Sequence, residues 1–271
     1  MDDESDPADA VEPRRPSVAA AIRAWRDELH ASAIFLTRLP VRWRGDMPAD
    51  LPARSLRAGP LVGAAIGLAA GLVYAGSGWL GLPATLAAVV AVGAQVAVTG
   101  ALHEDGLADV ADGFGGGDDR EAKLAIMRDS RIGAYGAVAL MLTLAARILA
   151  IAALAQPVAV MAALAAAGAA SRAAWPGLMV WLRPARAEGL AASHGRPALD
   201  RLVATVGLAA LVALIALPLV QALVALAVGA AAAAGLGLLA QRQIDGYTGD
   251  VLGAAQQSVE VAMLLALAAL A

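Results

Sequence analysis

The feature that most constrains this chain is a series of apolar runs, each about twenty residues long. A helix needs about 20 apolar residues to cross ~30 Å of hydrocarbon, where only helices and closed barrels satisfy their backbone hydrogen bonds. Pro218 and a nearly uncharged junction alone separate the fifth run from the sixth, so six or eight spans stay open. The sequence predicts an all-α, polytopic transmembrane helical bundle of about seven spans, near residues 58–76, 80–102, 132–155, 157–181, 201–219, 221–240 and 254–271.

The segment before the first span has two parts. Residues 1–17 are acidic, contain proline and lack periodic apolar residues, which predicts a disordered tail. Residues 18–39 carry apolar side chains at helical spacing between charged ones, which predicts an N-terminal amphipathic helix in the membrane interface. A single integral membrane catalytic domain is therefore expected over residues 18–271. The chain has no cysteine, which excludes disulfides, thiolate metal sites and cysteine nucleophiles.

Charge alternates along the connections between the spans. The connections after the first, third and fifth spans contain no Asp, Glu, Lys or Arg, whereas the others, at 103–131, 182–200 and 241–253, hold most of the charges. Of the 20 Lys and Arg residues, 17 lie either in the N-terminal region before the first span or in the three charged connections. The positive-inside rule places that side in the cytoplasm. The pattern predicts a multi-pass protein of a bacterial inner membrane with a one-sided active site facing the cytoplasm.

The densest group of acidic residues follows the second span. Asp105, Asp109 and Asp112 are spaced i, i+4 and i+7, so on a helix they share one face, where like charges repel. Mg²⁺ prefers carboxylate and phosphate oxygens, so the row predicts one or two Mg²⁺ ions bound with a phosphorylated substrate. A solvated helix face is the plain alternative, and a zinc site that includes His103 is another.

The loop after the acidic row is rich in basic and hydroxyl side chains. Lys123, Arg128 and Arg131 are candidates to bind substrate phosphate, and Ser130 adds a hydroxyl donor. The alternative is a basic juxtamembrane stretch that only anchors the third span. In the second charged loop, Arg186, like Arg183, is a candidate to grip either phosphate or lipid headgroups.

Three charged residues fall within predicted spans. Arg147, Arg172 and Glu260 are expected to face the bundle interior, because an unpaired charge at mid-bilayer costs roughly 2.5–3.5 kcal/mol or more. Pairing of Arg with Glu260 and binding of substrate phosphate both remain open as their role. Glycines at i+4 spacing in the first span, at Gly63, Gly67 and Gly71, predict close helix packing.

Several segments resemble the cobalamin synthase family, also called the adenosylcobinamide-GDP ribazoletransferases. TGALHEDGLADVADGFGG followed by KLAIMRDSRIGAYG is similar to the family's signature, and FLTRLPV, AGPLVGAAIG and GYTGDVLGAAQQSVE are similar to its other typical segments, in family order. They are distributed over most of the chain outside the tail. The tail looks like an addition, and residues 182–200 resemble the family only at scattered positions.

This resemblance implies a Mg²⁺-dependent membrane enzyme that joins adenosylcobinamide-GDP to α-ribazole or its 5′-phosphate and releases GMP, with the lipid bilayer as a further partner and no nucleic acid. We expect Asp105, Asp109 and Asp112 to bind metal and to act in catalysis together with Glu104; which carboxylate is the general base stays open. The expected substrate-binding residues are His103, Lys123, Arg128, Asp129, Ser130, Arg131 and, through its family segment, Asp250. A homo-oligomer is left open.

Two other functions fit parts of the sequence. The acidic run is reminiscent of the CDP-alcohol phosphotransferases, although their Asp-Gly-x-x-Ala-Arg pattern is absent. A membrane transporter would also combine many spans with charges inside them, but transporters commonly carry internal repeats and sites at mid-depth. The sequence shows no convincing repeat, and its acidic residues gather at one interface.

Overall fold

The structure, a computed structural model, describes residues 17–186 and 195–271. The predicted tail, apart from Ser17, and part of the second charged loop lie outside these residues. Within them the chain is helical and holds no strand, only an isolated bridge between Pro184 and Tyr247. The helices are α1 (Val18–Leu36), α2 (Leu51–Ser55), the 3₁₀ turn η1 (Leu56–Ala58), α3 (Gly59–Trp79), α4 (Ala84–Thr99), α5 (Leu102–Gly116), α6 (Arg120–Ile126), α7 (Ala134–Leu154), α8 (Pro157–Trp181), α10 (Leu199–Ala216), α11 (Leu219–Ile244) and α12 (Gly249–Ala269).

The predicted bundle of about seven spans is confirmed, with one span shorter than expected. Six helices of the described chain are long and apolar enough to cross a membrane, and α4 supplies a seventh when it is taken with α5. The predicted second span at 80–102 is wrong at both ends, because α4 has only 16 residues. Gly100 and Ala101 both adopt left-handed backbone (φ 66° and 58°), and α5 turns away from α4 by 91°. The acidic row therefore lies on a helix that crosses the end of the bundle.

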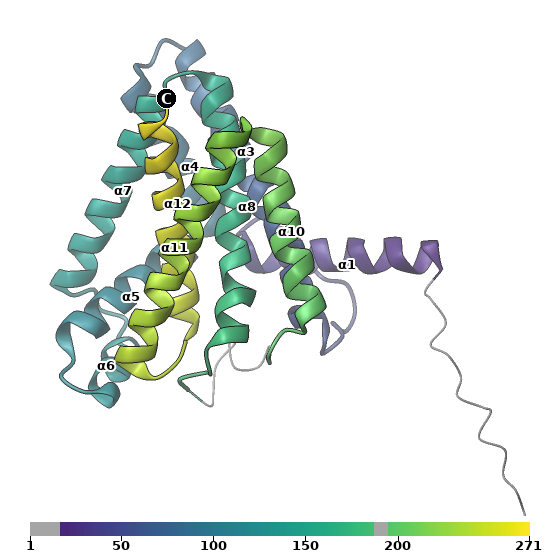
Figure 1. The fold of residues 1–271 in the computed structure, drawn as a ribbon, viewed down its shortest axis with the longest axis vertical. Coiled ribbons are helices and arrows are strands. Elements are labelled where there is room, and N and C mark those ends of the chain that lie inside the picture. The colour runs from purple at the N-terminus through teal and green to yellow at the C-terminus, as the bar shows by residue number, and fades with distance from the viewer. Residues whose placement is uncertain (1–16, 187–194) are drawn as a thin grey trace, which may run out of the picture.

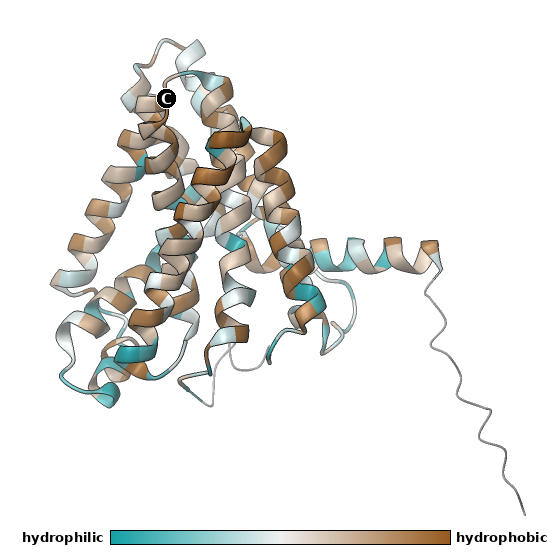
Figure 2. Cartoon of the chain, in the orientation of Figure 1, coloured by the Kyte–Doolittle hydropathy of each residue, from teal (hydrophilic) through white to brown (hydrophobic). Residues whose placement is uncertain are grey.

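The connections fall at two opposite ends of the bundle, as their charges predicted. The uncharged turns after α3, α7 and α10 lie at the same end as the C-terminus, whereas α5, α6 and the start of α12 lie at the other end (Figure 1). Hydrophilic residues are concentrated at that second end and along α1, and the spans between are mostly apolar (Figure 2). All charged loops in the described residues thus converge on one surface.

Helix α1 leaves the bundle sideways, across the direction of the spans (Figure 1). Its first turns are exposed, with Val18 at 77% and Ile22 at 64%, whereas Glu28 is buried. Arg54 and Arg57 both pair with the Glu28 carboxylate, and the Arg57 guanidinium lies 4.3 Å from the centre of a Trp25 ring. The amphipathic helix is confirmed, and its place in the membrane interface stays a prediction.

The closest helix contact is between α3 and α8. Gly63 faces Gly168, and Gly67 faces the Leu164 carbonyl, so that the two backbones touch without side chains between them. Small residues allow the two helices to approach closely, so that their backbones make van der Waals contacts. In lipid such packing stabilises the helix pair, because burial of apolar side chains gives little driving force there. The packing role predicted for Gly63, Gly67 and Gly71 is confirmed.

Gly67→Ala is expected to lower the midpoint of thermal unfolding of the purified protein. The added Cβ would lie 2.0 Å from the Leu164 carbonyl oxygen, so α3 and α8 would have to separate. Overpacking of this kind costs about 1–3 kcal/mol. Gly76→Ala is the matched control, because it lies on the same helix with no atom within 4 Å of its added Cβ. Equal unfolding midpoints for the two variants would contradict the packing argument.

Candidate active site

Helix α5 and the start of α12 bring four aspartates together at the charged end of the bundle. Burial increases along the row: Asp105 is exposed, Asp109 is half-buried and Asp112 is buried. Asp250 occupies the first turn of α12, whose backbone passes so close to α5 that a Cβ on Gly106 would lie 2.8 Å from the Asp250 carbonyl oxygen. Gly106 is therefore required for the two acidic segments to meet.

Asp109 is the electrostatic centre of this acidic cluster, which comprises Asp105, Asp109, Asp112 and Asp250. Its pKa is raised to about 7, first by burial and then by the charges of the other three aspartates, while Arg186 lowers it. Asp109 lies at the charged end of the bundle, on a helix that packs against α6 beyond the 91° bend from α4 (Figure 1). A nearby cation would stabilise the ionised form of this carboxyl group, because it would offset the repulsion from the other three aspartates.

Arg186 is the cation that the structure adds to the acidic cluster. Its guanidinium lies 3.8 Å from the Asp250 carboxylate and also donates to the Leu124 carbonyl of α6, at 2.9 Å. Backbone bonds between Tyr247 and residues Arg183 and Ala185, each of 2.8 Å, join the loop after α8 to the loop before α12. The sequence offered Arg186 only as a candidate for phosphate or lipid headgroups, since nothing local showed this pairing of loops.

Asp112 has a structural partner that the sequence did not reveal. Its two carboxylate oxygens accept the backbone N–H groups of Gly133 and Gly136, at 2.7 and 2.8 Å, at the start of α7. A Cβ at either glycine would clash with this carboxylate. Asp112 thus caps α7 and ties it to α5, so its carboxylate is already engaged within the protein. Its predicted role as a metal ligand stays a prediction.

Two predicted site residues lie on other faces of α5. His103 is buried against Trp175, with ring centres 5.5 Å apart, and its Nε2 has no hydrogen-bond partner among the described residues. Glu104 is buried and accepts from Arg147 at 2.9 Å and from Gln257 at 3.0 Å. Neither side chain joins the acidic cluster, because consecutive helical residues point about 100° apart.

The predicted phosphate-binding residues lie on α6 and the connection to α7. Lys123 is on α6, and Arg128 and Ser130 are exposed in the connection. Arg128 lies near enough to Arg186 for their charges to interact. Asp129 and Arg131 pair with each other at 2.6 Å, and the Arg131 hydrogen bonds hold the pKa of Asp129 at about 2. Arg186 is therefore the basic side chain shown to act on the acidic cluster, and Arg128 lies near Arg186.

The donor set of the acidic cluster suits a hard divalent cation. The cluster offers only carboxylate oxygens as ligands. The raised pKa of Asp109 indicates that Arg186 balances the charges of these carboxylates incompletely. In the described part of the chain, no three acidic or histidine side chains converge closely enough to hold a cation as they stand. Mg²⁺ usually completes its shell with water and substrate phosphate oxygens, so one or two carboxylates are sufficient.

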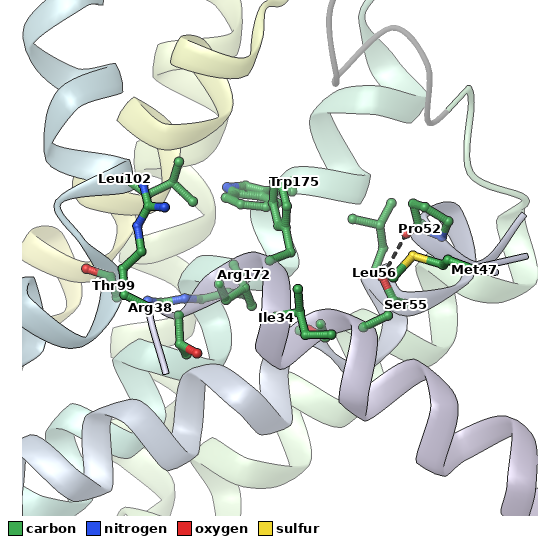
Figure 3. A pocket seen from close by; sticks show the side chains of 16 residues that line it. Ile34, Arg38, Met47, Pro52, Ser55, Leu56, Thr99, Leu102, Arg172 and Trp175 are labelled. Atoms are coloured by element: carbon green, nitrogen blue, oxygen red, sulfur yellow. Dashed lines mark hydrogen bonds between the residues drawn. The ribbon is translucent and has the colours of Figure 1, made fainter. Parts of the chain in front are cut away.

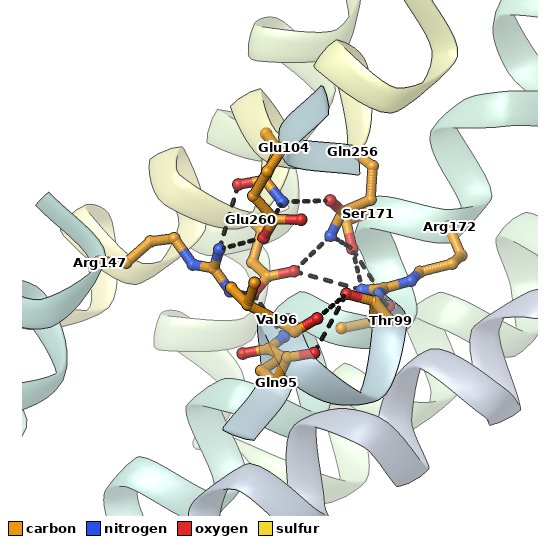
Figure 4. Close-up of polar contacts among 11 residues, drawn as sticks. Gln95, Val96, Thr99, Glu104, Arg147, Ser171, Arg172, Gln256 and Glu260 are labelled. Carbon is orange, nitrogen blue, oxygen red and sulfur yellow. Dashed lines mark hydrogen bonds and ion pairs between the residues drawn. The ribbon is translucent and has the colours of Figure 1, made fainter. Parts of the chain in front are cut away.

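The charged residues within the spans form one buried network (Figure 4). Arg147 donates to Glu104 at 2.9 Å and to Glu260 at 3.0 Å, and Arg172 donates to Glu260 at 3.2 Å. The amides of Gln95 and Gln256 also donate to Glu260. The Gln256 amide donates to the Ser171 hydroxyl as well, and the Gln257 amide donates to the side-chain oxygen of Gln256. Two guanidiniums and two carboxylates balance in charge. Of the two roles considered for these residues, pairing with Glu260 is confirmed, and the network connects α5 to α7, α8 and α12.

Known proteins resemble this chain over nearly its whole length. It is 47% identical to an adenosylcobinamide-GDP ribazoletransferase of Bradyrhizobium diazoefficiens, over 89% of this chain and 93% of the relative. Proteins of the same name from Azorhizobium caulinodans and Sinorhizobium medicae are each 43% identical, over 88% and 91% of this chain and 94% and 98% of their own lengths. No solved structure matches.

The match extends from the middle of α1 to the last turn of α12 and includes both segments of the acidic cluster. The sequence profile of the cobalamin-5-phosphate synthases aligns with residues 28–268. Only the N-terminal region and the last three residues fall outside it. The resemblance seen in the sequence motifs is confirmed, and the chain belongs to the cobalamin-5-phosphate synthase family.

Proposed function

We propose that this protein is a Mg²⁺-dependent adenosylcobinamide-GDP ribazoletransferase, which joins adenosylcobinamide-GDP to α-ribazole or its 5′-phosphate and releases GMP. The relatives that carry this name align over about nine-tenths of the chain. The observation that carries the proposal is the acidic cluster, in which Asp109 is raised in pKa beside Arg186 at the charged end of the bundle. Membership of this family favours a transferase over a transporter or a CDP-alcohol phosphotransferase.

The described residues provide the groups that this reaction needs. Asp105, Asp109 and Asp250 would hold Mg²⁺, which when bound neutralises the diphosphate and stabilises the leaving phosphate. Arg128 and Arg186 would offset the remaining phosphate charge, and Lys123 on α6 would add a third basic group. A carboxylate of the acidic cluster would accept the proton of the incoming ribose hydroxyl. Asp112 would keep α5 fixed against α7 through its two backbone bonds.

An assay of the purified protein in lipid nanodiscs tests the proposal. With adenosylcobinamide-GDP and α-ribazole or its 5′-phosphate, we expect a cobalamin product and GMP in equal amounts. Addition of EDTA should stop the reaction and excess Mg²⁺ should restore it, because the carboxylates cannot neutralise a diphosphate alone. GMP without a cobalamin product would indicate hydrolysis instead of transfer. Full activity in EDTA would refute the metal requirement.

We also propose that the protein lies in the bacterial inner membrane with its charged end in the cytoplasm, as the positive-inside rule requires. Because the chain has no cysteine, single cysteines report orientation without background. In intact spheroplasts, an impermeant maleimide should label Gly78→Cys in the uncharged end of α3. It should label Asp118→Cys, between α5 and α6, only after the membrane is permeabilised. The reverse labelling pattern would contradict the orientation.

A further inference from the structure

A cavity of about 390 Å³ lies between α1, the α4–α5 corner and α8 (Figure 3). The residues of its wall that matter here are Phe35, Arg38, Thr99, Leu102, Arg172 and Trp175. Sites for small molecules are commonly 300–1,000 Å³, so the cavity matches a ligand near the lower end of that range. A corrinoid that carries a nucleotide diphosphate is far larger than this space.

The cavity has an aromatic wall and two buried N–H donors that lack a partner in the described part of the chain. The rings of Phe35 and Trp175 meet edge to face with centres 5.7 Å apart. Trp175 is only 7% exposed and Arg172 only 2%, yet the indole Nε1 of the first and the Nε of the second have no hydrogen-bond partner among the described residues. A buried donor left in this way is costly, so an acceptor atom on a bound ligand would be stabilised here. The flat rings suit a planar aromatic base.

The charge of the cavity is positive. Arg172 is balanced by Glu260, whereas Arg38 pairs with no acidic residue of the described chain. The Arg38 backbone N–H donates to the Val98 carbonyl at 2.7 Å, and its side chain crosses Gly100, where a Cβ would lie 2.5 Å from the Arg38 Cγ. The left-handed glycine at the corner therefore leaves room for this guanidinium. An anionic group on a ligand would give Arg38 its counter-charge.

Helix α5 runs from the cavity to the acidic cluster, although none of the four aspartates lines the cavity. Leu102 lines the cavity, and Asp105 follows it by three residues, so both lie on the same face of the helix about one turn apart. Asp109 comes one turn later on that face. A ligand held in the cavity would have to extend along this face of α5 for its hydroxyl group to reach the carboxylates.

We infer that this cavity is the subsite for the acceptor nucleotide, with its aromatic base against Trp175 and Phe35 and its phosphate on Arg38. The inference rests on the proposed function and adds the place at which the acceptor binds and the side chain that binds its phosphate. Arg38 is thus the residue that recognises the phosphorylated acceptor. An anionic phospholipid headgroup entering beside α1 is the competing occupant, and the experiment separates the two.

The test compares the KM for each substrate in nanodiscs of fixed lipid composition. Arg38→Gln should raise the KM for α-ribazole 5′-phosphate about tenfold or more, the loss expected for a charge-assisted hydrogen bond. It should leave the KM for α-ribazole and for adenosylcobinamide-GDP nearly unchanged. Arg42→Gln is the matched control, since Arg42 is exposed in the same segment and does not line the cavity. Trp175→Phe keeps a ring but loses the N–H, and should weaken both acceptors alike by a few fold.

The outcomes are decisive in both directions. An unchanged KM for α-ribazole 5′-phosphate in Arg38→Gln would overturn the inference while leaving the proposed function intact. Loss of co-purifying phosphatidylglycerol from that variant, seen by native mass spectrometry without a change in KM, would assign the cavity to lipid. If the wild type shows no turnover, the proposed function fails, and equilibrium dialysis of α-ribazole 5′-phosphate against wild type and Arg38→Gln still decides the inference.

Discussion

Asp109→Asn should reduce turnover by roughly 100- to 1,000-fold, the range seen when one group that stabilises developing charge is removed. Asparagine keeps the size of the side chain but cannot carry the negative charge that a divalent cation requires. Asp109 is the residue on which the charges of Asp105, Asp112 and Asp250 all act, so it lies where a cation would be shared. The measurement is the rate of GMP release in nanodiscs at saturating Mg²⁺.

The same variant should fold at least as well as the wild type. Replacing Asp109 removes repulsion within the acidic cluster, and the Asp109 side chain accepts no hydrogen bond from the described residues. We therefore expect an unchanged or higher unfolding midpoint, which separates lost chemistry from lost structure. Asp118→Asn is the matched control, because Asp118 is an exposed acid in the adjacent loop. Turnover of Asp109→Asn within tenfold of wild type would remove Asp109 from the proposed metal site.

Arg147→Met in the buried network should cause a large loss of stability. The variant leaves Glu104 without its guanidinium partner and leaves Glu260 with Arg172 alone. Removing one partner from a buried ion pair costs about 3–5 kcal/mol, because the remaining charge stays out of water. The expected result is a clear drop in the unfolding midpoint of protein purified in detergent, together with lower expression in the membrane.

A second substitution should restore part of this loss. Arg147→Met combined with Glu104→Gln removes one charge of each sign, so that Arg172 and Glu260 still pair. The double variant is expected to be more stable than the single one, whereas Arg242→Met, at an exposed position of α11, should change stability little. Equal instability of the single and double variants would mean that lost packing, and not an unbalanced charge, accounts for the effect.

Much of the architecture was readable from the sequence. Hydropathy located the spans, and the alternation of charged and uncharged connections placed every charged loop at one end. Burial of Arg147, Arg172 and Glu260 followed from the cost of charge in hydrocarbon. The i, i+4, i+7 spacing placed Asp105 and Asp109 on one helix face, and the family segment that contains Asp250 pointed to its part in the site.

Other features were out of reach because they depend on the path of the chain at a few residues. The two left-handed residues Gly100 and Ala101 turn α5 by 91°, and a hydropathy window extends the span through them. Because of that turn, the side chains of His103 and Glu104 are buried in the bundle, whereas that of Asp105 is exposed. Without the position of α5, the sequence predicted all of them in one site.

What the sequence by itself determined is the set of properties that depend on neighbours along the chain: which segments cross the bilayer, which end holds the charges, and which acids share a helix face. Only the tertiary structure decided the partners across the bundle, namely Asp250 and Arg186 beside Asp109, the Asp112 cap of α7, and the cavity beside Arg38. The physical reason is that helix formation and membrane insertion are set by local composition. Contacts between residues a hundred positions apart depend on how close each pair of helices can pack.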